Sequence, residues 1–591
     1  MKDFLKFTFA TVLGIIVAGV VLFFLGILTV FSMASSSESE TQVKENSIMM
    51  MELNGTITER SVTNPLNSLL GESGASFGLN DLLASIQKAK ENENIKGIYL
   101  QADLMSAGYA SLESLRNALK DFKESGKFIV AYADTYTQDL YYVASVADKV
   151  LLNPSGMIEW RGIASQPMFY KDLLEKVGVE MQIFRVGTYK SAIEPFTATE
   201  MSPANREQTK AYISSIWGKI TADVAADRNL SIEKLNALAD RMMMLQPAQE
   251  SINEGLADTL IYKNDVKNYL KKLVGIEEDD NLNVLGLEEM KNVKKNRPKD
   301  PSGNIIAVYY AEGEIVDSEA TNFSGETCIN ASKVIKDLRR LKDDEDVKAV
   351  VLRVNSPGGS AYGSEQIWYA VSELKKEKPV IVSMGDYAAS GGYYISCNAD
   401  TIVAEPTTLT GSIGIFGMFP SVQKLTKKIG IDFDVVKTNT YADFGDLTRP
   451  MNAGEQAMMQ ANVERGYDLF LTRCADGRGT TKEAINEVGQ GRVWTGADAK
   501  NLGLVDILGG MDTALEIAIE KADVEAYTLM EYPAQESFLD MLTNGKSAGN
   551  YIKNNIMGKN LGEWSKTFFF IENIDKVNRI QARMPFEPNI H

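Results

Sequence analysis

An internal repeat constrains the fold of this chain more than any other feature of its 591 residues. Residues 129–154 (IVAYADTYTQDLYYVASVADKVLLNP) match residues 381–406 (IVSMGDYAASGGYYISCNADTIVAEP) without a gap, at an offset of 252 positions. Residues 95–100 (IKGIYL) match residues 347–352 (VKAVVL) at the same offset. A repeat of this length is typical of a duplicated domain. The sequence therefore predicts two homologous domains in tandem.

The segments between and around the two copies set the expected domain boundaries. The stretch between the copies alternates acidic and basic clusters and ends in Pro301 and Gly303, which interrupt regular structure. We expect a cytoplasmic N-terminus with a membrane anchor at 1–34, a polar linker at 35–46, the first domain at 47–275, a charged linker at 276–303, the second domain at 304–525 and a C-terminal extension at 526–591.

Each copy alternates short apolar runs with segments of helical periodicity. The β-branched runs 98–100 and 350–354 are typical of buried strands, and a second such run follows in each copy, at 128–132 and 380–384. Between the runs of the first copy, one helix face carries Leu112, Leu115, Leu119 and Phe122. Strands that alternate with helices predict an α/β fold with a mostly parallel sheet in each domain.

The N-terminal segment has the composition of a membrane anchor. Residues 7–33 are almost entirely apolar and carry no charge. About 20 such residues span a bilayer, whereas the core of a cleaved signal peptide has about 7–15. Lys2 and Lys6 precede the run, so the positive-inside rule orients the N-terminus toward the cytoplasm. In a bacterium, this predicts a single-pass inner-membrane protein whose domains face the periplasm.

The histidine and cysteine content excludes several kinds of site. The only histidine is His591, the last residue, so neither a histidine-dependent catalytic triad nor a multi-histidine zinc site is expected. Cys328, Cys397 and Cys474 are widely spaced and form no CxxC motif. We therefore expect no metal and no other cofactor. A net charge of −18 disfavours nucleic acid as a partner, because nucleic-acid-binding proteins present a basic face.

Two glycine-rich segments of the second copy follow predicted strands. They are NSPGG, which ends in Gly358 and Gly359, and DYAASGG, which contains Ser390 and Gly391. The ends of parallel strands are the usual place for sites in α/β folds. Ser390 is a candidate nucleophile, and the backbone N–H groups of Gly359 and Gly391 are candidate oxyanion donors. The alternative is that both segments are tight turns that merely require glycine.

The repeat favours the functional interpretation. At the offset of 252, Ser390 corresponds to Gln138, and the glycine pair 358–359 corresponds to the Ser-Ala pair 106–107. The first copy keeps the strand pattern without these residues, so the fold itself does not require them. A nucleophilic serine also needs a base, and in the absence of histidine a lysine is the best remaining candidate. Lys190 corresponds to Ala442 in the second copy. These reciprocal losses predict one composite site between the two domains.

A lysine acts as a base only when it is neutral, which requires its pKa to fall from about 10.4 to roughly 7–8. Burial among apolar groups lowers a lysine pKa in this way. The main alternative for Lys190 is the ordinary one, a solvated loop lysine.

The motifs GTYKSAIEPF (187–196), NSPGG and DYAASGGYYI resemble the signal peptide peptidase A family, also called protease IV, in its long bacterial form. The resemblance covers nearly the whole chain, including the apolar N-terminus and the Arg-Met-Pro segment at 583–585. It implies a tandem duplication of a crotonase/Clp-peptidase-like domain. It also implies a Ser/Lys-dyad peptidase with Ser390 as nucleophile, Lys190 as general base, and Gly359 and Gly391 as oxyanion donors. Beyond the resemblance, we expect the adjoining Gly358 to belong to the same site and Ser191, beside the lysine, to support it.

The same resemblance implies a homotetramer at the outer face of the membrane and, as substrates, remnant signal peptides and other short apolar peptides. Two other functions remain open. A crotonase-like acyl-transfer or hydratase enzyme would polarise a thioester with the same glycine loops, but it would need a catalytic carboxylate. A catalytically silent membrane scaffold would not depend on Ser390 or Lys190. A penicillin-binding enzyme is disfavoured, because SxxK occurs without the SDN and KTG motifs.

Overall fold

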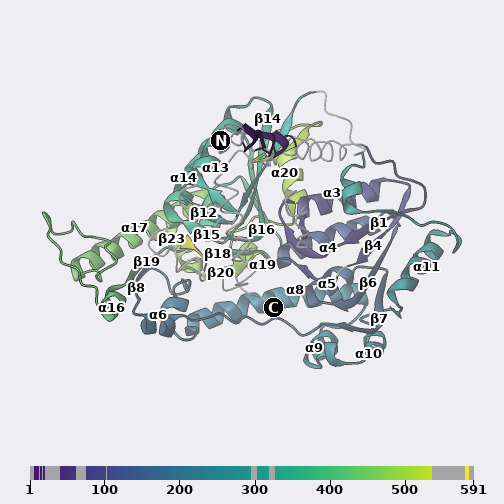
Figure 1. Cartoon of the computed structure of the whole chain (residues 1–591), viewed down its shortest axis with the longest axis horizontal. Helices are drawn as coiled ribbons and strands as arrows, with labels where there is room; N and C mark the ends of the chain where they lie inside the picture. Colours follow the sequence, from purple (N-terminus) through teal and green to yellow (C-terminus); the bar gives the residue numbers. More distant parts are fainter. Residues whose placement is uncertain are drawn as a thin grey trace.

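The computed structural model describes residues 6–8, 10, 11, 13–15, 17–19, 21, 40–61, 75–101, 103–294, 302–318, 327–534 and 580–584. Its architecture is mixed α/β, with one mostly parallel sheet in each half of the chain and a third sheet that joins the halves (Figure 1). Helices α11 (Lys263–Val274) and α16 (Gln423–Lys428) lie at opposite ends of the long axis.

The first sheet has the order β10-β1-β4-β6-β7-β9, and every neighbouring pair is parallel. Its strands are β1 (Ser47–Glu52), β4 (Ile95–Gln101), β6 (Phe128–Tyr136), β7 (Lys149–Ile158), β9 (Thr259–Leu260) and β10 (Asn283–Leu285). The other helices of this half are α3 (Leu79–Glu91), α4 (Tyr109–Lys123), α5 (Gln138–Ala144), α6 (Lys171–Val177), α7 (Glu194–Thr197), α8 (Pro203–Arg228), α9 (Ile232–Asp240), the 3-10 turn η1 (Met243–Leu245), α10 (Ala248–Asn253) and α12 (Leu287–Lys291).

The second sheet has the order β20-β18-β16-β14-β11-β22, with β17 and β21 branching from β16. Only its β18–β20 pair is antiparallel among the described strands. Its strands are β11 (Ile305–Glu312), β14 (Val347–Ser356), β16 (Val380–Ala389), β17 (Thr401–Ala404), β18 (Leu409–Gly411), β20 (Val493–Thr495), β21 (Ile507–Leu508) and β22 (Thr528–Tyr532). The other helices of this half are α13 (Ala331–Asp343), α14 (Ala361–Lys375), α15 (Gly391–Ser396), α17 (Ala453–Arg478), α18 (Lys482–Val488), α19 (Gly496–Asn501) and α20 (Met511–Ala522).

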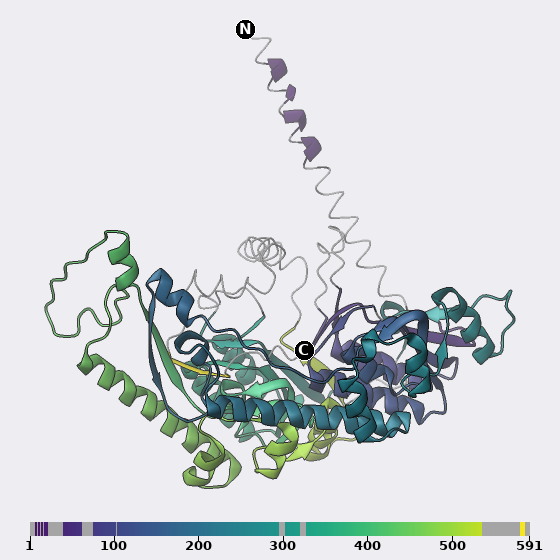
Figure 2. The same cartoon turned by 90° about the horizontal axis from the view of Figure 1, so that it is seen from below.

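The repeat extends to the lengths of the helices. Helices α4 and α14 each have 15 residues and begin 252 positions apart, at Tyr109 and Ala361. Helices α8 and α17 each have 26 residues and begin 250 positions apart, at Pro203 and Ala453. The two long helices are drawn in blue and green in Figure 2. The predicted alternation of strands and helices is confirmed in both halves, and both main sheets are mostly parallel.

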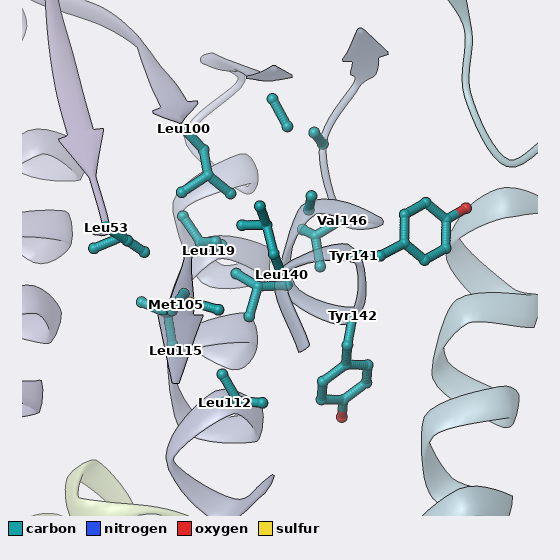
Figure 3. Close-up of a cluster of buried hydrophobic side chains, with 14 of the residues drawn as sticks. Leu53, Leu100, Met105, Leu112, Leu115, Leu119, Leu140, Tyr141, Tyr142 and Val146 are labelled. Carbon is teal, nitrogen blue, oxygen red and sulfur yellow. The ribbon is translucent and has the colours of Figure 1, made fainter. Parts of the chain in front are cut away.

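The hydrophobic core of the first half forms between α4 and the sheet. Leu112, Leu115, Leu119 and Phe122 are all fully buried, so the predicted helix face is confirmed. Figure 3 shows the three leucines packed with residues from other elements, among them Leu100 at the end of β4 and Leu140 of α5. Each such side chain contributes about 1.5–3 kcal/mol through burial. This packing fixes α4, whose N-terminal end contacts the second half.

A third sheet joins the halves, in the order β13-β12-β15-β23-β19-β8. Its strands are β8 (Glu180–Arg185), β12 (Glu314–Val316), β13 (Cys328–Asn330), β15 (Gly358–Ser360), β19 (Phe416–Ser421) and β23 (Ile580–Arg583). A separate, small sheet contains β2 (Gly55–Thr58), β3 (Ala75–Gly78) and β5 (Met105–Ser106). The antiparallel pairing of β8 with β19 runs from Glu180–Ser421 to Arg185–Phe416. It carries the chain of the first half, just before Lys190, onto the second half.

The expected linkers contain more regular structure than the sequence indicates. Strand β10 and helix α12 lie within 276–303, and β10 pairs with β1. Strands β22 and β23 lie within the expected C-terminal extension. Strand β22 belongs to the second sheet and β23 to the third sheet described above. The domain boundaries themselves stay predictions.

The predicted membrane anchor lies mostly outside the described residues, because positions 22–33 and several before them are not described. No described helix is long and apolar enough to cross a membrane.

Candidate active site

Ser390 lies at the junction between β16 and α15. It is fully buried, and its backbone N–H donates to the carbonyl of Gly411 at 2.8 Å. Its φ is +54° with a ψ of −110°, a positive-φ conformation that is uncommon for residues other than glycine. Strained backbone of this kind persists where the surrounding structure holds it, and it is frequent at functional sites. This conformation occurs at the one residue between the end of β16 and the start of α15.

The structure brings Lys190 to Ser390. The amino group of Lys190 lies 2.8 Å from the hydroxyl oxygen of Ser390, and both side chains are fully buried. The loop that carries the lysine is held by the second half, because the N–H of Tyr189 donates to the carbonyl of Gln490 at 2.9 Å. Close approach of the backbones is required here, since a Cβ on Gly491 would lie 2.7 Å from Cα of Lys190.

Burial lowers the pKa of the Lys190 ammonium well below its ordinary value. The charged form loses its hydration in this position, and no carboxylate accepts a hydrogen bond from the amino group among the described residues. Its other two contacts are neutral oxygens of Ser412, the carbonyl at 3.0 Å and the hydroxyl at 3.1 Å. The surroundings therefore favour the free amine, the form in which lysine accepts a proton.

Sequence reasoning missed Ser412. This residue is fully buried and has a φ of +49°, directly after β18. A signal was present, because the position that corresponds to Ser412 at the offset of 252 is Trp160. The comparison that singled out Ser390 therefore also distinguishes this second serine.

The predicted glycines lie beside Ser390 and require their lack of a side chain. Gly358 and Gly359 have φ values of +99° and +154°. A Cβ on Gly358 would lie 2.7 Å from the backbone nitrogen of Gly391, and one on Gly359 would lie 2.6 Å from the nitrogen of Ile315. The two glycine loops are thus in direct contact through Gly358 and Gly391, next to Ser390.

Asn355, the first residue of the NSPGG motif, ties these loops together. Its side-chain oxygen accepts from the N–H of Tyr387 at 3.1 Å, and its amide nitrogen donates to Glu59 at 3.0 Å. The other oxygen of Glu59 accepts from the guanidinium of Arg353 at 2.8 Å. Both Glu59 and Arg353 are buried, at 4% and 2% exposure. A carboxylate of the first half therefore orders the glycine loop of the second half.

Ser191, the expected support of Lys190, is hydrogen-bonded to α8 and not to the amino group of the lysine. Its hydroxyl donates to the amide oxygen of Asn205 at 2.9 Å and accepts from Gln208 at 2.9 Å, both on α8. Lys190 instead contacts Ser390 and Ser412. Ser191 anchors the loop to α8, so any effect of this residue on the amine is indirect.

The first half has no counterpart of this arrangement among the described residues. At the position that corresponds to Ser390, the side-chain oxygen of Gln138 accepts from the N–H groups of Arg161 and Gly162, at 3.1 and 3.0 Å. The first half therefore has an amide with satisfied hydrogen bonds at the position where the second half has the serine hydroxyl. In the part of the chain that the structure describes, the serine, the lysine and the glycine loops meet at one place, between the halves.

The family model of peptidase family S49 matches residues 121–277 and 372–525, which together are just over half of the chain. The chain belongs to peptidase family S49. "Protease 4" of Salmonella typhi is 38% identical to this S49 peptidase over 556 residues, covering 91% of this chain and 88% of the relative. "Serine protease SPPA, chloroplastic" of Arabidopsis thaliana is 31% identical, covering 85% and 74% respectively. The protein is a serine peptidase.

Among solved structures, a ClpP1 mutant from Listeria monocytogenes aligns with 35% of this chain and 94% of its own, with 17% identity and a TM-score of 0.24. A likeness of this size does not identify the finer fold of the S49 peptidase. The crotonase/Clp-like domain type and the catalytic roles of Ser390 and Lys190 stay predictions at this point.

Proposed function

We propose that this S49 peptidase cleaves peptides with a Ser/Lys dyad, in which Ser390 is the nucleophile and Lys190 the general base. The observation that carries the proposal is the 2.8 Å contact between the two side chains at a fully buried position. A nucleophile and a base within hydrogen-bond reach are the signature of nucleophilic catalysis.

The contacts of the lysine suit the neutral state that a base requires. A neutral amine has two N–H groups and one lone pair. The carbonyl and hydroxyl oxygens of Ser412 are acceptors for the two N–H groups. The lone pair is then directed at Ser390, whose hydroxyl donates to it. Ser412 is therefore a positioning residue in this proposal, because it acts through Lys190.

Each step of the reaction follows from this geometry. Lys190 takes the proton of the Ser390 hydroxyl while Oγ attacks the carbonyl carbon of a peptide bond. The N–H groups of Gly359 and Gly391 stabilise the oxyanion that forms. The lysine returns its proton to the departing amine, and an acyl-enzyme on Ser390 remains. A water molecule, deprotonated by Lys190, then hydrolyses the ester and releases the serine.

The proposed substrates are remnant signal peptides and other short apolar peptides, on the resemblance to signal peptide peptidase A. The proposed location is the bacterial inner membrane, with the anchor at 7–33 and both halves in the periplasm. The composition of this segment and the lysines before it support the topology. We expect the protein to stay with the membrane fraction after alkaline extraction, and a variant without residues 1–34 to be released.

The proposed assembly is a homotetramer, and the repeat supports self-association. Residues 432–437 correspond to β8 at the offset of 252, but they form no strand. This segment and the residues just before it expose five apolar side chains: Ile429, Ile431, Phe433, Val435 and Val436. The counterpart of β19 is the segment 164–169, in which Ser165 makes a β-bridge. We propose that 432–437 of one copy pairs with 164–169 of the next, as β8 pairs with β19 within the chain. Such a head-to-tail contact produces a closed ring when the rotation is suitable.

The assembly is tested by sedimentation of the detergent-solubilised protein. We expect Val436→Asp, at a side chain with 98% exposure, to convert the tetramer into smaller species. Leu245→Asp, at an exposed residue outside this segment, is the matched control and should stay tetrameric. An unchanged sedimentation profile for Val436→Asp would contradict the proposed contact.

The dyad is tested by hydrolysis of a quenched leucine-rich peptide. We expect Ser390→Ala and Lys190→Ala to lose activity by a factor on the order of 10⁴–10⁶, with folding retained. Lys210→Ala, at an exposed lysine of α8, and His591→Ala should keep wild-type rates. Full turnover by either dyad variant would exclude the dyad and favour a scaffold function.

A further inference from the structure

A short segment of the second half, residues 490–492, lies between Ser412 and the loop that carries Lys190. On the side of the lysine, the carbonyl of its first residue accepts from the N–H of Tyr189 at 2.9 Å. On the other side, the carbonyl of Arg492 accepts from the N–H of Ser412 at 2.7 Å. The segment therefore contacts both the loop of the proposed base and the residue that supplies two acceptors to its amine.

The side chain of Arg492 lies between two aromatic rings. Its guanidinium carbon is 4.8 Å from the ring centroid of Tyr189 and 4.3 Å from that of Trp494 on β20. One of its terminal nitrogens donates to the hydroxyl of Tyr189 at 3.1 Å and lies 3.1 Å from the carboxylate of Glu207 on α8. A cation over aromatic faces is attracted by their π-electrons, and more strongly where water is scarce. With an exposure of 22%, the Arg492 side chain is mostly shielded from water.

The backbone of Tyr189 is held independently of this side chain. The amide nitrogen of Gln208 on α8 donates to the carbonyl of Tyr189 at 3.1 Å, and its amide oxygen accepts from the N–H of Val493 at 3.2 Å. Together with the bond to the carbonyl of Gln490, these contacts attach the loop to β20. We therefore expect the loop to fold without the guanidinium of Arg492, which orients the tyrosine ring.

The repeat shows that the fold does not require this arrangement. Helices α10 and α19 each have six residues and begin 248 positions apart, and α8 and α17 begin 250 positions apart. At these offsets, the cation, the second ring and the carboxylate are replaced by uncharged, non-aromatic residues: Met244, Gln246 and Ala457. Tyr441, the counterpart of Tyr189, is kept, although Ala442 follows it in place of the lysine. The contacts of Arg492 thus occur together with the lysine.

We propose that Arg492 is a positioning residue for the general base. This inference rests on the proposed Ser/Lys dyad. The guanidinium fixes the residue directly before Lys190, and the carbonyl fixes Ser412, which accepts from the amine. One residue therefore sets the place of the amine relative to Ser390. A loop fixed in this way also keeps water from the amine, which has no exposed surface.

The first test measures two pH profiles of the detergent-solubilised Arg492→Leu variant. One is the hydrolysis of the quenched peptide, and the other is the labelling of Ser390 by a fluorophosphonate, which reacts with nucleophilic serines. We expect kcat at pH 7 to fall by about 10- to 100-fold at nearly unchanged KM, because a displaced base costs rate. Both profiles should also move upward by about one pH unit, because water that reaches the amine stabilises its charged form.

The matched control is Arg465→Leu, at an exposed arginine of α17, which should keep both wild-type profiles. A slower Arg492→Leu variant whose profiles have the wild-type midpoints would overturn the positioning role, since a merely structural effect lowers the rate at every pH alike. Arg492→Lys keeps a cation beside the rings, and we expect it to recover part of both the rate and the midpoint. An Arg492→Lys variant no better than Arg492→Leu would also contradict the role of the cation.

A double variant tests the route through the tyrosine ring. If Arg492 acts through Tyr189, the combination of Arg492→Leu with Tyr189→Leu should lose no more activity than the worse single variant. Fully additive losses would overturn this route. The labelling assay separates the inference from the dyad. Labelling that depends on Lys190 but is indifferent to Arg492 would overturn this inference alone. A wild-type protein whose Ser390 is not labelled at any pH would overturn the dyad and the inference with it.

Discussion

Lys190 and Ser390 are 200 positions apart in the chain, yet their side chains are in contact at 2.8 Å. Each lies in the half of the repeat that lacks the other, since Gln138 stands opposite the serine and Ala442 opposite the lysine. After duplication, neither half needs a complete site of its own, as long as the two halves together supply the serine and the lysine. The pairing of β8 with β19 joins the two halves, so the contact between Lys190 and Ser390 depends on both of them.

The buried lysine should cost the protein stability at neutral pH. Its folded-state pKa is lowered by burial, so below the unfolded pKa of about 10.4 the unfolded chain binds the additional proton. The free energy of unfolding therefore rises with pH through the window between the lowered pKa and about 10.4. We expect Lys190→Met, which removes this titration, to melt at a higher temperature than the wild type at pH 7. Calorimetry should show the difference shrinking toward pH 10, and a lower melting temperature for the variant at pH 7 would contradict the argument.

The same lowered pKa governs the activity. Only the neutral amine accepts the proton of Ser390, so kcat/KM should rise with pH through the pKa of Lys190 and then level off. Lys190→Arg keeps a cation of similar length but stays protonated at every accessible pH. We expect it to be inactive across the whole profile. A rise in its rate above pH 8 would identify a different base.

Ser412→Ala should impair the reaction without abolishing it. The change removes the hydroxyl acceptor at 3.1 Å and keeps the carbonyl at 3.0 Å. Lys190 becomes a cation when it takes the proton of Ser390, and a hydrogen bond to a charged group contributes about 1.5–3 kcal/mol, so we expect kcat to fall by about 10- to 150-fold. The pH–rate profile should also shift, because the hydroxyl contacts the titrating amine. A fall in kcat without any shift of the profile would indicate a purely structural role.

Gly391→Ala tests the oxyanion donors. Its Cβ would lie 2.7 Å from the hydroxyl of Ser364 and 3.0 Å from the backbone oxygen of Ala582, so we expect the backbone at the donor to shift. Loss of one donor lowers kcat by about 10²–10³, and we expect an effect of this size with little change in KM. Gly218→Ala on α8 is the matched control, because its Cβ would meet nothing within 4 Å. That variant should keep full activity and gain up to about 1 kcal/mol in stability.

Glu59→Gln should weaken the junction of the halves. The change leaves the guanidinium of Arg353 buried at 2% exposure without its carboxylate. Breaking a buried pair in this way costs about 3–5 kcal/mol, which denaturant unfolding measures directly. Glu233→Gln, at an exposed position of α9, should change stability by less than about 0.5 kcal/mol. Equal stability of the two variants would show that Glu59 does not hold the halves together.

Much of the fold is readable from the sequence because it is local or repeated. The buried face of α4, from Leu112 to Phe122, follows from helical periodicity, and the strands follow from apolar runs. The juxtaposition of Lys190 and Ser390 follows from a different argument, the comparison of two copies of one domain. That comparison works for Ser412 as well, once Trp160 is noticed opposite it.

Other features depend on partners that are distant in sequence. Strand β23 has only four residues, and its place between β15 and β19 is set by pairing with strands more than 160 positions away. Strand β10 and helix α12 occupy part of a segment whose charge clusters are typical of a linker. Ser191 follows Lys190 directly in the sequence, but its hydroxyl bonds to Asn205 and Gln208 of α8 and not to the lysine amine. Long-range pairing and side-chain direction leave no local pattern to read.

The most direct test of the composite site mixes two inactive chains. Ser390→Ala keeps the lysine and Lys190→Ala keeps the serine, so their co-expression restores activity only when the dyad forms between neighbouring subunits. The contact at 2.8 Å lies within one chain, so the mixture should stay as inactive as either variant alone. In a head-to-tail assembly with the dyad shared between subunits, random mixing would restore about a quarter of the wild-type sites. Hydrolysis of the quenched peptide at that level would contradict the site described here.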